Sequence, residues 1–156
     1  MTPDDPTGRL AADVGTAAQA RQRTVIAAES VTAGSVGQAL AAAPDASEWF
    51  AGSLVTYMDS AKRSILGVDT DDVFTADCAQ QMAAGALRVS GADVAVAITG
   101  VAGPDPADGH EVGEVYICVG SVNALDTFEH RLTGEPAEIV DAAKLHALRH
   151  LRDALA

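Results

Sequence analysis

Apolar residues recur along the chain with two periods that alternate. Between residues 10 and 21 they return every three or four positions, as in an amphipathic helix, whereas residues 24–28 form a β-branched and apolar run typical of a strand. The alternation continues along the chain. It predicts further strands at residues 51–57, 93–99, 114–120 and 127–132, and further helices at residues 33–43, 60–66, 75–90 and 135–154.

This order of elements predicts an α/β fold, specifically a three-layer α/β/α domain with a mixed, mostly parallel sheet. The segment Val-Ala-Val-Ala-Ile at residues 94–98 lacks polar alternation, which indicates a central strand covered on both faces. The last two strands are close in sequence and are expected to pair antiparallel.

Length and composition favour one domain over residues 1–156, because 48% of the residues are hydrophobic and can fill one core. Residues 1–9 are polar and carry acids and prolines. They lack the basic start and apolar stretch of a secretion signal, and we expect them to form a flexible tail.

The 22 acidic and 10 basic residues give a net charge of −12, which would repel a nucleic-acid backbone and an anionic bilayer. We therefore expect neither partner, although a local pocket of backbone N–H groups could still bind a small anion. Cys78 and Cys118 lie far apart and are expected to be reduced thiols of a cytoplasmic protein.

Three turns that follow predicted strands carry the candidate chemistry, at residues 29–34, 57–62 and 99–105. Ligands of open α/β sheets bind at the carboxyl ends of the strands, so these turns are candidates for one site. Ser30 could act as a nucleophile, or Ser30 or Thr32 could only cap the following helix. Lys62 near a helix start would have a lowered pKa and could be a general base, or it could be a solvated surface lysine.

Two other patterns point to less specific chemistry. The small residues from Thr99 to Pro104 would let a ligand approach the backbone, but they match neither a P-loop nor a dinucleotide-binding turn. His146 and His150 are four apart on a predicted helix, but no third ligand is indicated, so we expect no metal site.

Four motifs in order carry a resemblance that covers nearly the whole chain after Leu10. They are Ala-Glu-Ser-Val-Thr-Ala-Gly at residues 28–34, the segment from Gly52 through Tyr57 and Lys62 to Val68, Thr-Gly-Val-Ala-Gly-Pro-Asp at residues 99–105, and Val-Gly-Glu-Val-Tyr at residues 112–116. Together they resemble the CinA C-terminal domain family, the nicotinamide mononucleotide deamidases.

The resemblance implies hydrolysis of the carboxamide of nicotinamide mononucleotide to nicotinate mononucleotide and ammonia, without a metal or organic cofactor. It implies catalytic roles for Ser30, Tyr57 and Lys62, with Tyr57 orienting the other two groups, and it implies a homo-oligomer. The residues expected to bind this small-molecule nucleotide are Glu29, Thr32, Gly34, Thr99, Gly100, Ala102 and Gly103.

Several positions depart from the family pattern. Val31 replaces a cysteine, Ala33 a glycine and Met58-Asp59 a Ser-Asn pair, and the loop at residues 106–111 lacks the family's glycines and Lys-Pro pair. Pro136 stands where the family has a substrate-binding arginine, so Arg131 or Arg63 would have to supply that cation. An alternative function is therefore a catalytically weak or silent nucleotide-binding module.

Overall fold

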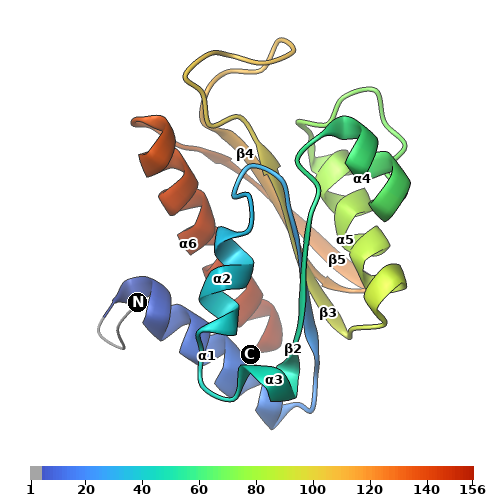
Figure 1. Ribbon diagram of the computed structural model, residues 1–156, viewed down its shortest axis with the longest axis vertical. Helices are drawn as coiled ribbons and strands as arrows, with labels where there is room; N and C mark the ends of the chain where they lie inside the picture. The colour runs from blue at the N-terminus through green and yellow to red at the C-terminus, as the bar shows by residue number, and fades with distance from the viewer. Residues whose placement is uncertain (1–4) are drawn as a thin grey trace.

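Six helices and five strands make up the described part of the computed structural model, residues 5–156 (Figure 1). In chain order they are α1 (Pro6–Ala20), β1 (Val25–Glu29), α2 (Ser35–Ala41), α3 (Ala46–Trp49), β2 (Phe50–Val55), α4 (Asp59–Leu66), α5 (Ala76–Ser90), β3 (Val94–Gly100), β4 (Glu114–Ser121), β5 (Ala124–Arg131) and α6 (Pro136–Leu155).

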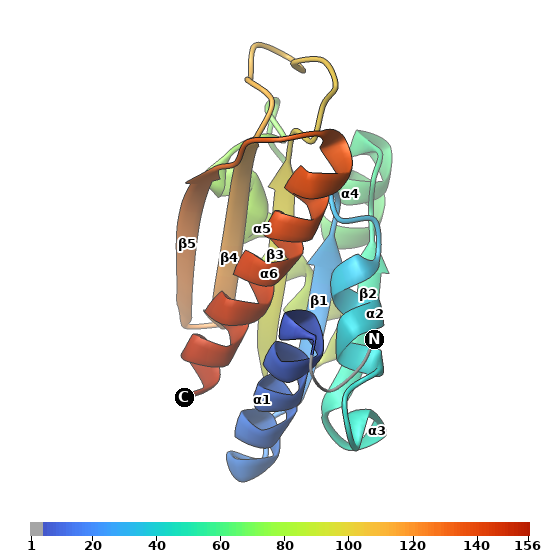
Figure 2. The same ribbon diagram turned by 90° about the vertical axis from the view of Figure 1, so that its left-hand side faces the viewer.

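The five strands form one sheet in the order β2-β1-β3-β4-β5. β1 pairs in parallel with β2 and β3, whereas β4 pairs antiparallel with β3 and β5. The predicted mixed sheet is confirmed, and β4 alone runs against the other four strands. α1, α2 and α6 cover one face and α4 and α5 the other, which confirms the three layers (Figures 1 and 2).

The central strand β3 is buried over all seven residues, as its unbroken apolar sequence predicts. Its larger residues, Val94, Val96 and Ile98, pack with α1, α2 and α6, and its alanines pack with α4 and α5. On the alanine side the packing is close. A Cβ atom at Gly85 of α5 would lie 2.0 Å from the carbonyl oxygen of Leu66 in α4, so this contact requires glycine.

The start of α1 differs from the prediction. Asp5 is the N-cap residue, its carboxylate accepts a hydrogen bond of 3.2 Å from the Thr7 N–H, and Pro6 occupies the first helical position. Residues 6–9 are therefore helical and do not belong to a tail. Residues 1–4 of the predicted tail lie outside the described part of the chain.

Strand β5 begins three residues before the predicted position. Ser121 of β4 pairs with Ala124 of β5, so only Val122 and Asn123 lie between the strands. Of the residues between the two predicted strands, 121 and 124–126 therefore belong to the strands of a tight hairpin, and only 122 and 123 form its turn. β5 is an edge strand in which exposed residues are interspersed with half-buried ones, and this mixture obscures its apolar pattern.

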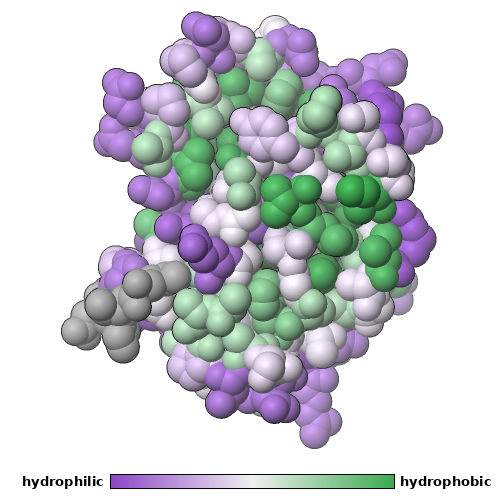
Figure 3. All heavy atoms as spheres, in the orientation of Figure 1, coloured by the Kyte–Doolittle hydropathy of each residue, from purple (hydrophilic) through white to green (hydrophobic). Residues whose placement is uncertain are grey.

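Exposed apolar side chains gather over β2 and α4 (Figure 3). The large ones in this region are Val55, Tyr57, Met58 and Ile65. Among the helices of residues 5–156, none has both the length and the hydropathy that crossing a bilayer requires.

Candidate active site

A pocket of about 180 Å³ lies where the turns after β1, β2 and β3 meet. The three turns singled out in the sequence therefore converge at one edge of the sheet. Of the predicted site residues, Ser30, Tyr57, Lys62, Gly100, Ala102 and Gly103 line this pocket, together with Val31, Asp59, Phe74, Val101, Asp105 and Ala107.

Glu29 was predicted to bind substrate, but its side chain points away from the pocket into the protein. It is fully buried, with 0% exposure. Its carboxylate accepts hydrogen bonds from two hydroxyls, Thr32 Oγ1 and Ser53 Oγ, each at 2.6 Å, and from three backbone N–H groups at the start of α2, those of Gly34, Val36 and Gly37, at 3.2, 2.9 and 2.9 Å. Glu29 is thus the anion that satisfies the free N–H groups of α2.

This arrangement corrects the capping interpretation of Ser30 and Thr32. The N-cap residue of α2 is Gly34, with a left-handed φ of 103° and no side-chain cap. The close approach of α2 to Ser53 of β2 requires glycine at position 37, because a Cβ atom there would lie 2.6 Å from Ser53 Cβ.

Thr32, Gly34 and Thr99 were also predicted to line the ligand, which stays a prediction; in the structure all three make internal contacts. Thr32 and Gly34 donate to Glu29, whereas buried Thr99 donates through its hydroxyl to the Val73 carbonyl at 2.7 Å. None of the three is among the residues that line the pocket. They hold the turns in place.

Ser30 lies at the end of β1 with its residue only 5% exposed. Its N–H donates to the Ile98 carbonyl at 3.1 Å, which ties the turn to β3, and its carbonyl accepts from the Ala33 N–H at 3.0 Å. Its hydroxyl forms no hydrogen bond with any residue in the range 5–156. The backbone is therefore fixed while the hydroxyl oxygen stays available to the pocket.

Lys62 is 1% exposed, which excludes the solvated surface lysine. Its Nζ donates a hydrogen bond of 2.8 Å to the Tyr57 carbonyl, and within the described chain it has no other hydrogen-bond acceptor. Burial lowers the pKa of the amine, and the nearby Cys78 and Asp59 oppose that shift. An ammonium group needs three acceptors, so a single acceptor in a buried site also favours the neutral amine.

The side chain of Tyr57 plays a smaller structural role than its backbone. The residue is 66% exposed at the mouth of the pocket, and its carbonyl oxygen holds the Lys62 amine. No hydrogen bond joins Ser30 directly to Lys62 or to the Tyr57 hydroxyl among the described residues, although all three side chains line the pocket.

Three residues of the pocket also carry backbone donors without a protein partner in the described chain. The N–H groups of Val31, Ala102 and Gly103 have no protein acceptor within residues 5–156. All three residues line the pocket beside Ser30. Such donors can stabilise the oxyanion that forms when a carbonyl carbon is attacked.

Six lining residues were not among the predicted site residues, and three of them, Asp59, Phe74 and Asp105, carry a charged or aromatic side chain. Met58 is the N-cap residue of α4, and it makes no side-chain capping hydrogen bond. Asp59 lies in the first turn of α4, three residues before Lys62. Phe74 comes from the connection between α4 and α5 and packs edge-on against His110, with ring centroids 5.7 Å apart.

His110 ties the 101–113 loop beside the pocket to the rest of the protein. Its Nε2 lies 2.6 Å from an Asp72 carboxylate oxygen, and its Nδ1 lies 3.3 Å from Glu114. The hydrogen bond to Asp72 raises the pKa of His110, and Glu114 adds to the shift. The buried Glu114 also accepts from the Tyr116 hydroxyl at 3.0 Å.

Neither arginine proposed to replace the one missing at position 136 lines the pocket. Arg131 forms ion pairs with Glu114 at 3.2 Å and Glu129 at 2.6 Å, and Arg63 donates to the Thr70 carbonyl. Pro136 is the first residue of α6, where Glu135 and Glu138 form a capping box.

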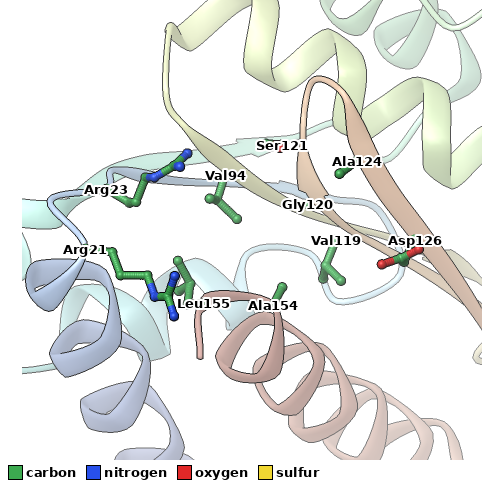
Figure 4. A pocket seen from close by; sticks show the side chains of 10 residues that line it. All are labelled: Arg21, Arg23, Val94, Val119, Gly120, Ser121, Ala124, Asp126, Ala154 and Leu155. Atoms are coloured by element: carbon green, nitrogen blue, oxygen red, sulfur yellow. The ribbon is translucent and has the colours of Figure 1, made fainter.

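A second hollow of about 230 Å³ lies at the opposite end of the sheet (Figure 4). Arg21 and Arg23 border it on one side and Asp126 on the other, with Val119 and Leu155 between them. Neither a lysine nor a histidine is among its described lining residues. It therefore lacks the buried amine that distinguishes the first pocket.

The predicted pair His146 and His150 meets a third histidine, His130 of β5. His130 Nε2 lies 2.8 Å from His150 Nε2, and the His130 and His146 rings stack at 4.0 Å. No group of three or more His, Cys, Asp or Glu side chains in residues 5–156 is arranged to hold a metal ion. The histidines instead form a ring cluster between β5 and α6.

Comparison with known proteins gives one consistent result. The sequence profile of the CinA C-terminal domain matches residues 7–155. Competence-damage inducible proteins of Caldicellulosiruptor saccharolyticus and Bacillus pumilus are 40% and 34% identical over 82% and 85% of this chain. The chain spans about one third of the length of these curated relatives, at 33% of each.

Solved structures show the same relationship. A CinA superfamily protein from Klebsiella pneumoniae is 32% identical with a TM-score of 0.91, and the match covers 96% of this chain and 97% of that one. A competence/damage inducible protein from Agrobacterium tumefaciens is 33% identical with a TM-score of 0.89, over 97% and 96% of the two chains.

Proposed function

Because the chain belongs to the CinA C-terminal domain family, we propose that it is an amidohydrolase that converts nicotinamide mononucleotide to nicotinate mononucleotide and ammonia. One observation carries this proposal. The buried Lys62 amine, with its single backbone acceptor, lines the same pocket as the unpaired hydroxyl of Ser30. A neutral amine beside a serine hydroxyl is a recognised arrangement of base and nucleophile.

The geometry suggests how each group acts. A neutral amine has two N–H bonds and one lone pair, so donation to the Tyr57 carbonyl leaves the lone pair able to accept the Ser30 proton. Ser30 Oγ then attacks the carboxamide carbon, and the N–H groups of Val31, Ala102 and Gly103 are available to the oxyanion. The protonated Lys62 returns the proton to the leaving ammonia.

Water then attacks the acyl-serine ester, with Lys62 again as the base, and releases the carboxylate and Ser30. The positive pyridinium ring draws electrons from the carboxamide, which makes both attacks easier. In the alternative course Lys62 activates water directly and Ser30 orients it. A rapid-quench search for an acyl-enzyme distinguishes the two.

Ammonia release from nicotinamide mononucleotide tests the function. We expect turnover by the wild-type protein and loss of about 10² to 10⁴-fold in Ser30→Ala, a range typical of losing a principal catalytic group. The absence of ammonia from folded wild-type protein at high concentration would contradict the proposal.

A silent nucleotide-binding module is the second candidate. It is favoured by the absence of a direct hydrogen bond between Ser30 and Lys62 among the described residues and by Pro136 in place of an arginine. In that case the nucleotide would raise the melting temperature, as a ligand of the native state must, while no ammonia appeared.

A further inference from the structure

We propose that the pocket recognises the positive charge of a pyridinium ring and not a phosphate group, so that phosphate-free N1-substituted nicotinamides are substrates as good as the nucleotide. The simplest such compound is the riboside. This inference rests on the proposed amidase function and names the substrate class of that site.

The charges on the pocket wall support a cation. Two carboxylates, Asp59 and Asp105, line the pocket, and Lys62 is the only basic residue among the described lining residues. Two carboxylates against one amine leave the wall net negative even when Lys62 carries its proton. The wall is therefore net negative in the state that begins catalysis.

Aromatic side chains add to this preference. Tyr57 and Phe74 line the same pocket as the two carboxylates. The face of an aromatic ring attracts a cation and also stacks on a flat heterocycle. A pyridinium ring has both properties, whereas a phosphate dianion would be repelled by Asp59 and Asp105.

No arginine is among the described residues that line the pocket, and the two proposed to reach it are engaged elsewhere. Arg131 is held between Glu114 and Glu129, and Arg63 donates to a backbone carbonyl. α6 begins at the end of the sheet where the pocket lies (Figure 2), but its first residue is Pro136.

Two carboxylates already lie at the start of α6. The capping box places the Glu135 and Glu138 carboxylates on the N–H groups that could otherwise bind an anion. A phosphate there would meet two negative charges. Arg131, Arg63 and the start of α6 therefore offer the phosphate no compensating contact, and the unpaired N–H groups of the pocket are those assigned to the oxyanion.

Asp59 is the residue that sets this selectivity. It lies in the first turn of α4, where no capping bond uses its carboxylate, and it lines the pocket three residues before Lys62. Asp59→Asn preserves its shape and removes its charge. Asp71→Asn is a matched control, because Asp71 is exposed and does not line the pocket.

Ammonia release from the riboside and the nucleotide tests the inference. We expect the wild-type kcat/KM for the riboside to equal or exceed that for the nucleotide. Asp59→Asn should lower the riboside value about tenfold, mainly through KM, the size of effect expected from one nearby charge that is partly screened. Asp71→Asn should change it less than twofold.

Binding provides a second readout that does not need turnover. The reduced 1,4-dihydro riboside has nearly the same shape but an uncharged ring. Calorimetry with the Ser30→Ala protein should show the oxidised riboside binding at least about tenfold more tightly than the reduced one, with Asp59→Asn closing that gap.

The outcomes separate the two proposals. Ammonia from neither compound would contradict the amidase function, while the calorimetry would still decide what the pocket recognises. A nucleotide kcat/KM more than tenfold above that of the riboside would overturn the inference and leave the function standing. Equal binding of the two ring forms, or equal effects of Asp59→Asn and Asp71→Asn, would also overturn it.

Discussion

The carbonyl oxygen of Tyr57 lies 2.8 Å from the amine of Lys62 and accepts its hydrogen bond. Tyr57, two residues after the end of β2, therefore positions the proposed base through its main-chain carbonyl, a group that every residue type has. The phenol remains exposed at the mouth of the pocket. Because the carbonyl of Tyr57 contacts Lys62 and its phenol does not, Lys62 and the Tyr57 side chain can be tested separately.

Lys62→Met keeps the apolar stem but removes the base. We expect kcat for ammonia release to fall by about 10² to 10⁴-fold, the usual contribution of a general base. Folding should survive because the methionine fills the same buried space. Lys144→Met is the control, since Lys144 lies on α6 and pairs with Asp141 at 3.7 Å. Undiminished turnover of the Lys62 variant would leave Ser30 without its proposed base.

Tyr57→Phe removes the hydroxyl and keeps the carbonyl that holds Lys62. We therefore expect kcat to change by less than about threefold, because the Tyr57 carbonyl still holds the Lys62 amine in place. Steady-state kinetics with saturating substrate measure this. A hundredfold loss would mean that the phenol itself takes part in catalysis, as the family resemblance implies.

Glu29→Gln replaces one acceptor oxygen by a donor in a site where five donors converge. At least one hydroxyl or N–H group then faces another donor in a buried place. We expect the free energy of unfolding to fall by about 2–3 kcal/mol, the range for losing hydrogen bonds to a charged group. Urea denaturation measures it, with exposed Glu48→Gln as the control.

The cluster of His130, His146 and His150 makes stability depend on pH. Burial lowers the pKa of all three below the ordinary value of 6.5, Arg149 adds to the shift of His146, and Asp153 opposes that of His150. A lowered folded-state pKa means that the unfolded chain binds more protons, so their contribution is present above pH 6.5 and is lost as the pH falls below it.

Denaturation at pH 7.5 and 5.5 measures this effect. The wild type should lose stability between these values, and a variant with all three histidines changed to glutamine should lose less. If the triple variant is too unstable to compare, His146→Gln alone should lose less unfolding free energy between the two pH values than the wild type does. An equal loss of unfolding free energy between the two pH values in the wild type and both variants would contradict a role of the cluster.

His110 should act in the opposite sense. Its pKa is raised, chiefly by the hydrogen bond to Asp72, so its stabilising contribution is full below pH 6.5 and is lost as the pH rises through the raised value. We expect amides in residues 104–112 to exchange faster at pH 8.5 than at pH 6, after correction for intrinsic rates. His110→Gln should remove this difference, and His146→Gln should retain it.

The sequence predicts the layers well because they depend on local patterns. The unbroken apolar run of β3 indicates a central strand, and the strand-end turns at Ser30, Tyr57 and Gly100 are placed together by the parallel direction of β1, β2 and β3. The helix start at Pro6 was also encoded, by Asp5 and the proline, but the polar composition of the segment concealed it.

The direction of individual side chains was not predictable in the same way. Glu29 turns inward because Ser53, 24 residues later on another strand, supplies one of its donors. Asp59 lines the pocket from the first turn of α4, and Met58 is the N-cap residue. The partner of His150 comes from β5, an edge strand whose start was missed. Each outcome depends on a contact between segments distant in sequence.

The close approach of α5 to α4 at Gly85 has a consequence for engineering the substrate preference. Any side chain at position 85 would collide with the backbone of Leu66, and so would displace the helix that carries both Asp59 and Lys62. A library that randomises the pocket wall can therefore keep this distant glycine constant, because its replacement would alter reactivity and selectivity together and hide the effect of every other substitution.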